Sequence, residues 1–212
     1  MKVIISSFSR YHAFSLAEQI QKRGYLHKLI VGYFDPKRNA QAYNIDRAKV
    51  KANISPVIFA HFPRRIRGLE WLYPITNYIA HEWYDKWAEK QLEQCDIFTG
   101  WAGFSFYSLK KAKSLGAVTV LERGSAHILA QKELLEEEYA KFGLKKPRVD
   151  PRIVERELQE FEEADYISIP STFVRRTFIE KGVPEEKLIQ IPYGISLKHF
   201  RPVPKEDDVF RV

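Results

Sequence analysis

Cysteine and long apolar runs are scarce in this sequence of 212 residues. The single cysteine, Cys95, cannot form an internal disulfide, so the fold does not need an oxidising compartment and we expect a cytoplasmic protein. The apolar run Val3-Ile4-Ile5 stops at Ser6, which makes it too short for a signal peptide or a membrane span. We therefore expect no segment that crosses a bilayer.

Motifs for metal, nucleotide and nucleic-acid chemistry are also missing. The sequence has no zinc-ligand spacing, no phosphate-binding lysine loop and no nucleophile elbow, so we expect neither a metal nor another cofactor. Its basic residues do not form a motif with base-stacking aromatics, so nucleic acid is not an expected partner. The net charge of +7 still implies an anionic partner, either a phosphorylated small molecule or an acidic membrane surface.

What the sequence does contain is an alternation of strand-like apolar runs with helical patterns. Strands are expected within residues 1–7 and at 26–31, 96–99, 117–121, 166–169 and 188–191, and helices at 13–23, 107–115, 128–142, 151–164 and after Ser171. The pattern predicts one α/β domain with a Rossmann-like, doubly wound and mainly parallel sheet. In such a sheet, ligands bind at the carboxyl ends of the strands.

Two segments in the first half are harder to interpret. Residues 36–53 are polar and basic without periodicity, and we interpret them as a loop with one short helix. Residues 56–62 form an apolar run that is predicted to be another strand. The aromatic-rich segment that follows, up to Leu92, is predicted to be helical.

The loop after the first strand is a candidate site because doubly wound folds hold phosphate there, against a helix N-terminus. Its candidate residues for binding acceptor or phosphate are Ser6, Ser7, Ser9, Arg10 and His12. The loop lacks the glycines of a dinucleotide fingerprint. Simple N-capping by Ser9 is the alternative interpretation.

The densest cluster of reactive side chains follows the strand at 117–121 and consists of Glu122, Arg123, Ser125 and His127. A guanidinium such as Arg123 can bind phosphate, and an imidazole such as His127 can orient or deprotonate a hydroxyl. The alternative is a surface loop in which Glu122 and Arg123 pair while Ser125 caps the next helix. Ser171, after the strand at 166–169, is a further candidate at the same edge of the sheet.

A basic and aromatic segment occupies residues 63–87. Arg64, Arg65 and Arg67 precede tryptophans and tyrosines that begin at Trp71, a combination that suits an anionic membrane interface. The alternative is a core helix whose aromatic rings pack inward, and three acidic residues, Glu70, Glu82 and Asp85, weaken the membrane interpretation.

Several stretches together resemble the N-terminal domain of family 4 glycosyltransferases, which have the GT-B fold. Residues Glu163-Ala164-Asp165-Tyr166-Ile167-Ser168-Ile169-Pro170-Ser171, Val183-Pro184-Glu185-Glu186-Lys187-Leu188 and Ile191-Pro192-Tyr193-Gly194-Ile195 are similar to the family's closing strand-helix-strand and its exit into the interdomain linker. Residues Tyr11-His12-Ala13-Phe14 to Lys22-Arg23-Gly24-Tyr25 are similar to its first helix. The middle of the chain, from about Pro36 to Trp87, matches poorly.

The resemblance implies one half of a retaining enzyme that moves a sugar from a nucleotide sugar to a glycan or lipid-linked acceptor hydroxyl, often without a metal. Residues 1–200 would bind the acceptor, Tyr193 and Gly194 would form the interdomain hinge, and residues 201–212 would lead into a C-terminal domain that binds the donor. By position, His127 matches the family's active-site histidine. Membrane-associated members have an interfacial helix where residues 63–87 lie, which implies a peripheral protein at the inner face of the cell membrane.

Two classes of function remain open at this point. The first is the glycosyltransferase half, which would be inactive alone. The second is a non-catalytic module that holds an anionic, phosphorylated ligand on the same sheet.

Overall fold

A computed structural model of the chain describes residues 1–35, 37, 39, 43–144, 150–194, 200, 207 and 209. Its strands are β1 Val3–Ser7, β2 Leu26–Val31, β3 Val50–Ala52, β4 Ile97–Trp101, β5 Val118–Glu122, β6 Tyr166–Ile169 and β7 Leu188–Gln190. Its helices are α1 Ala13–Lys22, α3 Ser55–His61, α4 Tyr73–Glu89, α5 Phe106–Ser114, α6 Ile128–Lys141, α7 Pro151–Glu163 and α8 Thr172–Glu180. Short 3-10 helices are η1 Arg47–Lys49, η2 Phe62–Arg65, η3 Glu70–Leu72 and η4 Glu185–Lys187.

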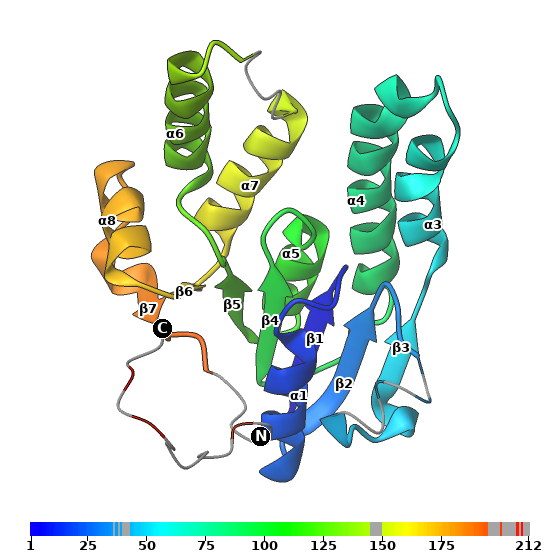
Figure 1. Ribbon diagram of the computed structural model, residues 1–212. Coiled ribbons are helices and arrows are strands. Elements are labelled where there is room, and N and C mark those ends of the chain that lie inside the picture. Colours follow the sequence, from blue (N-terminus) through cyan, green and yellow to red (C-terminus); the bar gives the residue numbers. More distant parts are fainter. Residues whose placement is uncertain are drawn as a thin grey trace.

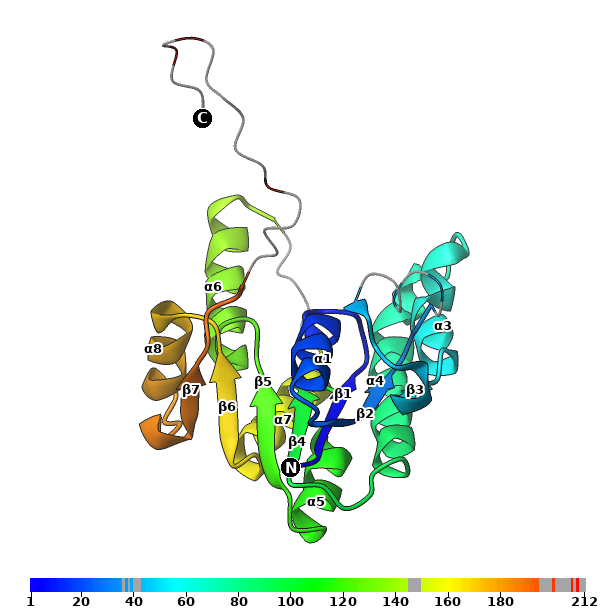
Figure 2. The ribbon, with the colours of Figure 1, turned by 90° about the horizontal axis from the view of Figure 1, so that it is seen from below.

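The strands form one sheet in the order β3-β2-β1-β4-β5-β6-β7, and every neighbouring pair is parallel. The chain moves outward from β1 in one direction and then returns to build β4 to β7 in the other. Right-handed crossovers therefore place α1 and α5 on opposite faces of the sheet, as Figures 1 and 2 show. This is the predicted doubly wound α/β fold.

The core follows from the apolar strands at the centre of the sheet. All five residues of β1 are buried, as expected for a central parallel strand covered on both faces. On one face of the sheet, Phe14 and Ala17 of α1 pack against β1. On the opposite face, Leu109 of α5 is fully buried in the same core cluster. Because β1 and β4 are hydrogen-bonded neighbours, their carboxyl ends lie side by side.

Two predictions in the first half of the chain are wrong. Residues 56–62 form helix α3 with the start of η2 rather than a strand. The local reason is Pro56, whose fixed φ fits the first turn of a helix, while an apolar run this short does not by itself separate helix from strand. The segment 36–53, predicted to be a loop with one short helix, contains the 3-10 helix η1 and also the edge strand β3, which was not predicted and pairs with β2 from Leu29 onward.

Candidate functional site

The clearest reactive contact at the carboxyl edge of the sheet joins His12 and Glu122. The Nε2 atom of His12 lies 3.2 Å from a carboxylate oxygen of Glu122, and the two side chains are 34% and 12% exposed. His12 stands at the N-cap of α1 but makes no capping bond with its side chain, so the imidazole is available to Glu122. Glu122 is the last residue of β5, two strands away from β1 in the sheet.

Aromatic rings from two further strand exits surround this pair. The imidazole of His12 lies 5.0 Å from the ring of Trp101, at the end of β4, and 5.1 Å from the ring of Tyr193, which follows β7. Tyr11 stacks on Trp101 at 6.5 Å. A tyrosine hydroxyl is protonated at neutral pH, so Tyr193 can donate a hydrogen bond, and its partial burial raises its pKa further.

A cavity of about 710 Å³ opens beside the pair. It runs from the exits of β1, β5, β6 and β7 down one side of α1, and its lining comprises Tyr11, His12, Ser15, Leu16, Glu18, Gln19, Lys22, Glu122, Arg123, Ser168, Ile169, Pro170, Ile191, Pro192, Tyr193 and Gly194. A volume of this size holds a small organic molecule or a sugar unit. The lining combines apolar rings with hydroxyl, amide and carboxyl groups.

Arg123 reaches the cavity with its charge already compensated. The side chain is buried, and Nη1 lies 2.7 Å from a carboxylate oxygen of the equally buried Glu157. The remaining donors bind the carbonyl of Ala126 at 3.2 Å and the amide oxygen of Gln131 at 2.8 Å. Arg123 therefore holds the loop after β5 in place against α7 and α6.

His127 does not line the cavity. Its ring is 2% exposed and packs 5.0 Å from both Phe161 and Phe178. Its Nδ1 accepts a hydrogen bond from the backbone of Leu129, so His127 itself, rather than Ser125, caps helix α6. Burial, followed by the charge of Arg123, lowers the pKa of His127 to about 4. These contacts give His127 a structural role.

The serines predicted to bind a ligand make internal hydrogen bonds. Ser6 and Ser7 are buried, with the Ser6 hydroxyl 3.0 Å from that of Tyr84 and the Ser7 hydroxyl donating to the carbonyl of Ser9 at 2.6 Å. Ser171 accepts from the backbone of Val174 and caps α8.

Two exposed candidate binding residues, Arg10 and Ser125, also make hydrogen bonds within the chain. Arg10 donates to the hydroxyl of Tyr43 at 2.6 Å, and the Ser125 hydroxyl lies 3.1 Å from Gln131. Of the loop residues proposed from sequence, His12, Glu122 and Arg123 share the cavity, together with the predicted hinge residues Tyr193 and Gly194.

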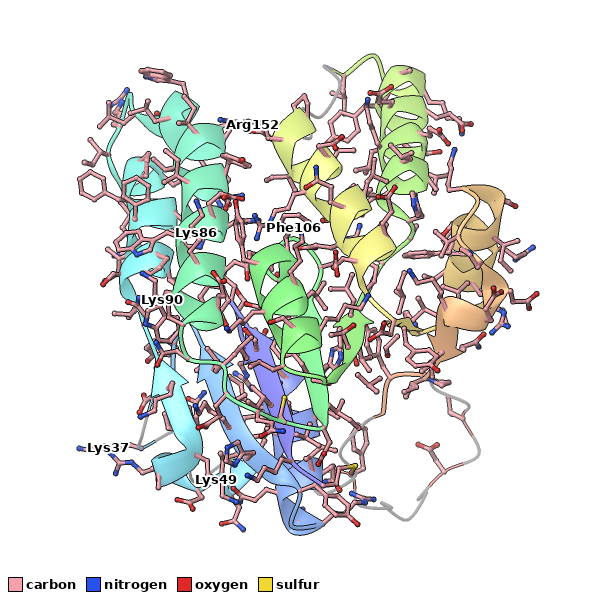
Figure 3. The ribbon with its side chains drawn as sticks, turned by 180° about the vertical axis from the view of Figure 1, so that it is seen from behind. Lys37, Lys49, Lys86, Lys90, Phe106 and Arg152 are labelled. Carbon is pink, nitrogen blue, oxygen red and sulfur yellow. The ribbon has the colours of Figure 1, made fainter. Side chains whose placement is uncertain are left out.

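A second cavity, of about 460 Å³, lies between α4, α5 and α7. Figure 3 labels Phe106 of α5 and Arg152 of α7, two of its lining residues. The cavity is also lined by the buried Arg156, which pairs with three carboxylates, Glu82, Asp85 and Glu160. Burial raises the pKa of Asp85 to about 6 and that of Glu160 to about 8. Sequence reasoning missed this network, because α4 and α7 meet only in the tertiary structure.

Three remaining predictions concern the segment at 63–87, metals and the linker. Arg64, Arg65, Arg67 and Trp71 are all exposed. Across the described residues, none of the helices is both long enough and apolar enough to span a membrane, and no cluster of acidic, histidine or cysteine side chains could hold a metal ion. The predicted linker at 201–212 lies outside the described residues except for Asp207 and Val209.

No family model and no curated protein matches this sequence. Solved structures do match: TcCGT1 in complex with UDP has a TM-score of 0.55 and 10% identity, over 97% of this chain and 54% of that one. A ugt transferase from Siraitia grosvenorii in complex with UDP (TM-score 0.49, 12% identity, 93% and 52%) and Arabidopsis thaliana UGT89C1 complexed with UDP (TM-score 0.48, 11% identity, 92% and 49%) are also similar.

This chain thus spans about half the length of the solved structures that it matches. Membership of family 4 in particular stays a prediction. At this low identity the likeness to TcCGT1 concerns the fold, and together with the seven-stranded parallel sheet it identifies the chain as a Rossmann-like half of the GT-B type.

Proposed function

We propose that this chain is the acceptor-side half of a glycosyltransferase, in which His12 removes the proton from the acceptor hydroxyl. The observation that carries the proposal is the 3.2 Å contact between His12 and Glu122 at the mouth of the 710 Å³ cavity. A carboxylate that fixes an imidazole beside a cavity is the usual arrangement of a general base. The match to about half of a UDP-bound structure supports a second α/β domain that holds the nucleotide sugar.

The hydrogen bond to Glu122 assigns the two ring nitrogens different tasks. When Nε2–H donates to Glu122, Nδ1 keeps its lone pair and can accept the proton of a hydroxyl. The hydroxyl oxygen then bonds to the anomeric carbon of the donor, and the bond from that carbon to the donor phosphate breaks. Glu122 compensates the positive charge of the imidazolium that results.

A base acting on the acceptor suits a single displacement, which inverts the anomeric configuration. The resemblance to family 4 implies retention instead, so the two lines of argument differ on this point. We favour inversion, because His12 and Glu122 both line the cavity. His127, which the resemblance to family 4 implies as the active-site histidine, is buried between phenylalanine rings instead. The anomeric configuration of the product, read from its proton NMR coupling constant, decides between them.

The alternative of an anion-binding module has less support in this cavity. Its two basic side chains with permanent charge, Arg123 and Lys22, already pair with Glu157 at 2.7 Å and Glu18 at 2.8 Å. A phosphorylated ligand would have to displace these carboxylates. A neutral acceptor, either a glycan or the sugar of a lipid-linked glycan, meets no such competition.

The test compares two histidine variants of the chain joined to its donor-binding domain. Each is supplied with a panel of nucleotide sugars and acceptors, and the release of nucleoside diphosphate is measured. His12→Ala should lower the rate of transfer by about 10²- to 10⁴-fold, the usual contribution of a general base. His127→Asn, which keeps a capping side chain on α6, is the matched control and should retain activity; the reverse result would assign the reaction to His127.

A further inference from the structure

The outer surface of α3 and α4 is apolar where it faces solvent. Two rows of residues with a spacing of four define it: Ile54, Ile58, Phe62 and Ile66, and then Trp71, Ile75, Ile79 and Trp83. Their exposed fractions range from 38% to 67%. A spacing of four keeps Ile75, Ile79 and Trp83 on one side of α4, where they form a stripe. The other members lie on α3, on the 3-10 helices η2 and η3, or beside them. We call these eight residues the apolar rows.

The two rows extend from α3 through η2 and η3 to α4, and α3 packs directly against α4. The ring of Phe59 on α3 contacts that of Trp83 on α4 at 6.0 Å, and the hydroxyl of Thr76 donates to the carbonyl of Ala60 at 3.2 Å. Figures 1 and 2 show α3 beside α4 at the end of the molecule next to β3. The rows therefore belong to one continuous face.

Helix α4 presents large apolar side chains to solvent as well as to the core. Its buried side consists of Ala80, His81, Tyr84, Asp85 and Ala88, while Ile75, Ile79 and Trp83 are exposed. A helix that packs on a core normally buries its large apolar side chains and exposes its charged ones. Because Asp85 is held inside by Arg156 and by Ser108, α4 cannot rotate to bury the apolar rows.

Basic side chains occupy the bend between the rows. Arg64, Arg65 and Arg67 are exposed. Arg64 lies over the ring of Tyr73 at 4.9 Å, and within the described part of the chain no ion pair joins any of the three to a carboxylate. One acidic residue, Glu70, lies in this bend, and its carboxylate accepts a hydrogen bond from the backbone of Gly68. The surface thus combines apolar and tryptophan side chains with a local excess of guanidinium groups.

We propose that this face docks on an anionic membrane surface, with the apolar rows in the boundary between headgroups and acyl chains and the three arginines on lipid phosphates. Tryptophan and isoleucine suit that boundary, and arginine binds phosphate as a fork of donors. A second copy of the chain fits less well, because it would place three arginines opposite three arginines. The proposal does not rest on glycosyl transfer.

Vesicle sedimentation tests the proposal with the full chain. Binding is measured on phosphatidylcholine vesicles with and without phosphatidylglycerol, at low and high salt. Arg64→Gln/Arg65→Gln/Arg67→Gln should weaken binding to the anionic vesicles by about a hundredfold, from about fivefold for each basic residue. Ile58→Gln/Phe62→Gln/Trp71→Gln should weaken it by at least about tenfold through lost apolar burial.

Matched controls change the same kinds of residue elsewhere. Phe142→Gln/Leu144→Gln/Phe173→Gln alters three exposed apolar residues, and Lys110→Gln/Lys132→Gln/Arg176→Gln alters three exposed basic residues. Both should bind like the parent chain, and unfolding curves of all four variants confirm that each is folded. The proposal is overturned if either test variant binds vesicles as its control does, or if anionic lipid does not increase binding. It is also overturned if light scattering shows a dimer of the parent chain that the apolar-row variant does not form, while neither the parent nor any variant sediments with vesicles.

Discussion

A β-carbon on Gly124 would lie 2.3 Å from the hydroxyl oxygen of Tyr193, so the phenol occupies the space that any other residue at position 124 would need. Gly124 follows β5, and Tyr193, which lines the cavity and lies beside His12, follows β7. The position of Tyr193 over the candidate site therefore depends on a glycine in another loop.

Gly124→Ala should displace Tyr193, and Tyr193→Phe should restore the fit, because the ring carbon that bears the hydroxyl stands at an acceptable 3.6 Å. We expect Gly124→Ala alone to cost about 1 kcal/mol of unfolding free energy, at the lower end for overpacking since Tyr193 is exposed and can move. The double variant should recover most of it. Denaturant unfolding of the four proteins in this cycle measures the coupling, and equal costs with and without Tyr193→Phe would show that the phenol is not the obstacle.

Glu122→Gln should lower the rate of glycosyl transfer, because Glu122 supports the base His12 and has no separate role in the reaction. The amide cannot compensate an imidazolium, so we expect a loss of about 10²-fold or more in kcat. Because the two side chains act as a unit, adding Glu122→Gln to His12→Ala should cost little more. Rates for the two single variants and the double variant test this, and multiplicative losses would contradict a working pair.

Arg156→Ala should destabilise the chain far more than Arg152→Ala on the same helix. The buried guanidinium of Arg156 compensates Asp85, which is fully buried and, with a pKa of about 6, ionised at neutral pH, so the removal of Arg156 should cost about 3 to 5 kcal/mol. Arg152 is exposed and pairs with Asp150 at the start of α7, so its loss should leave the unfolding free energy close to that of the parent. Urea unfolding at neutral pH compares the two variants, and similar midpoints would mean that Asp85 is neutral in the fold.

His127→Asn should make the chain less sensitive to acid. Burial lowers the pKa of His127 from 6.5 to about 4, so between these values the unfolded chain binds a proton that the folded chain does not. Unfolding then takes up a proton, and the unfolding free energy falls as the pH drops from 6.5 to 4, by at most about 3 kcal/mol for this group. Asparagine can still cap α6 but does not titrate there.

For His127→Asn the quantity to compare is the slope of unfolding free energy against pH. The unfolding free energy at a single pH is not informative, because the loss of packing against Phe161 and Phe178 lowers it at every pH. Denaturant unfolding at steps between pH 7 and pH 4 gives both slopes. Parallel curves for the variant and the parent would mean that His127 is protonated equally in the folded and unfolded chain.

The sequence alone determined the order of strands and helices in most of the chain. Strand β6 was predicted with its observed bounds, and Ser171 was predicted as the cap of α8, because buried parallel strands and helix caps carry local signals. The prediction failed at residues 56–62, where a short apolar run suits a helix as well as a strand. It failed again at β3, whose Val50-Lys51-Ala52 lacks a distinctive apolar pattern.

The sequence also indicated which edge of the sheet would bear the candidate site, since parallel strands bring their carboxyl ends to one rim. Only the tertiary structure decided which residues meet there. His12 pairs with Glu122, 110 residues away, because strand order puts only β4 between β1 and β5. The same packing buries His127 between α7 and α8, and no local pattern distinguishes these two histidines because burial depends on residues distant in the chain.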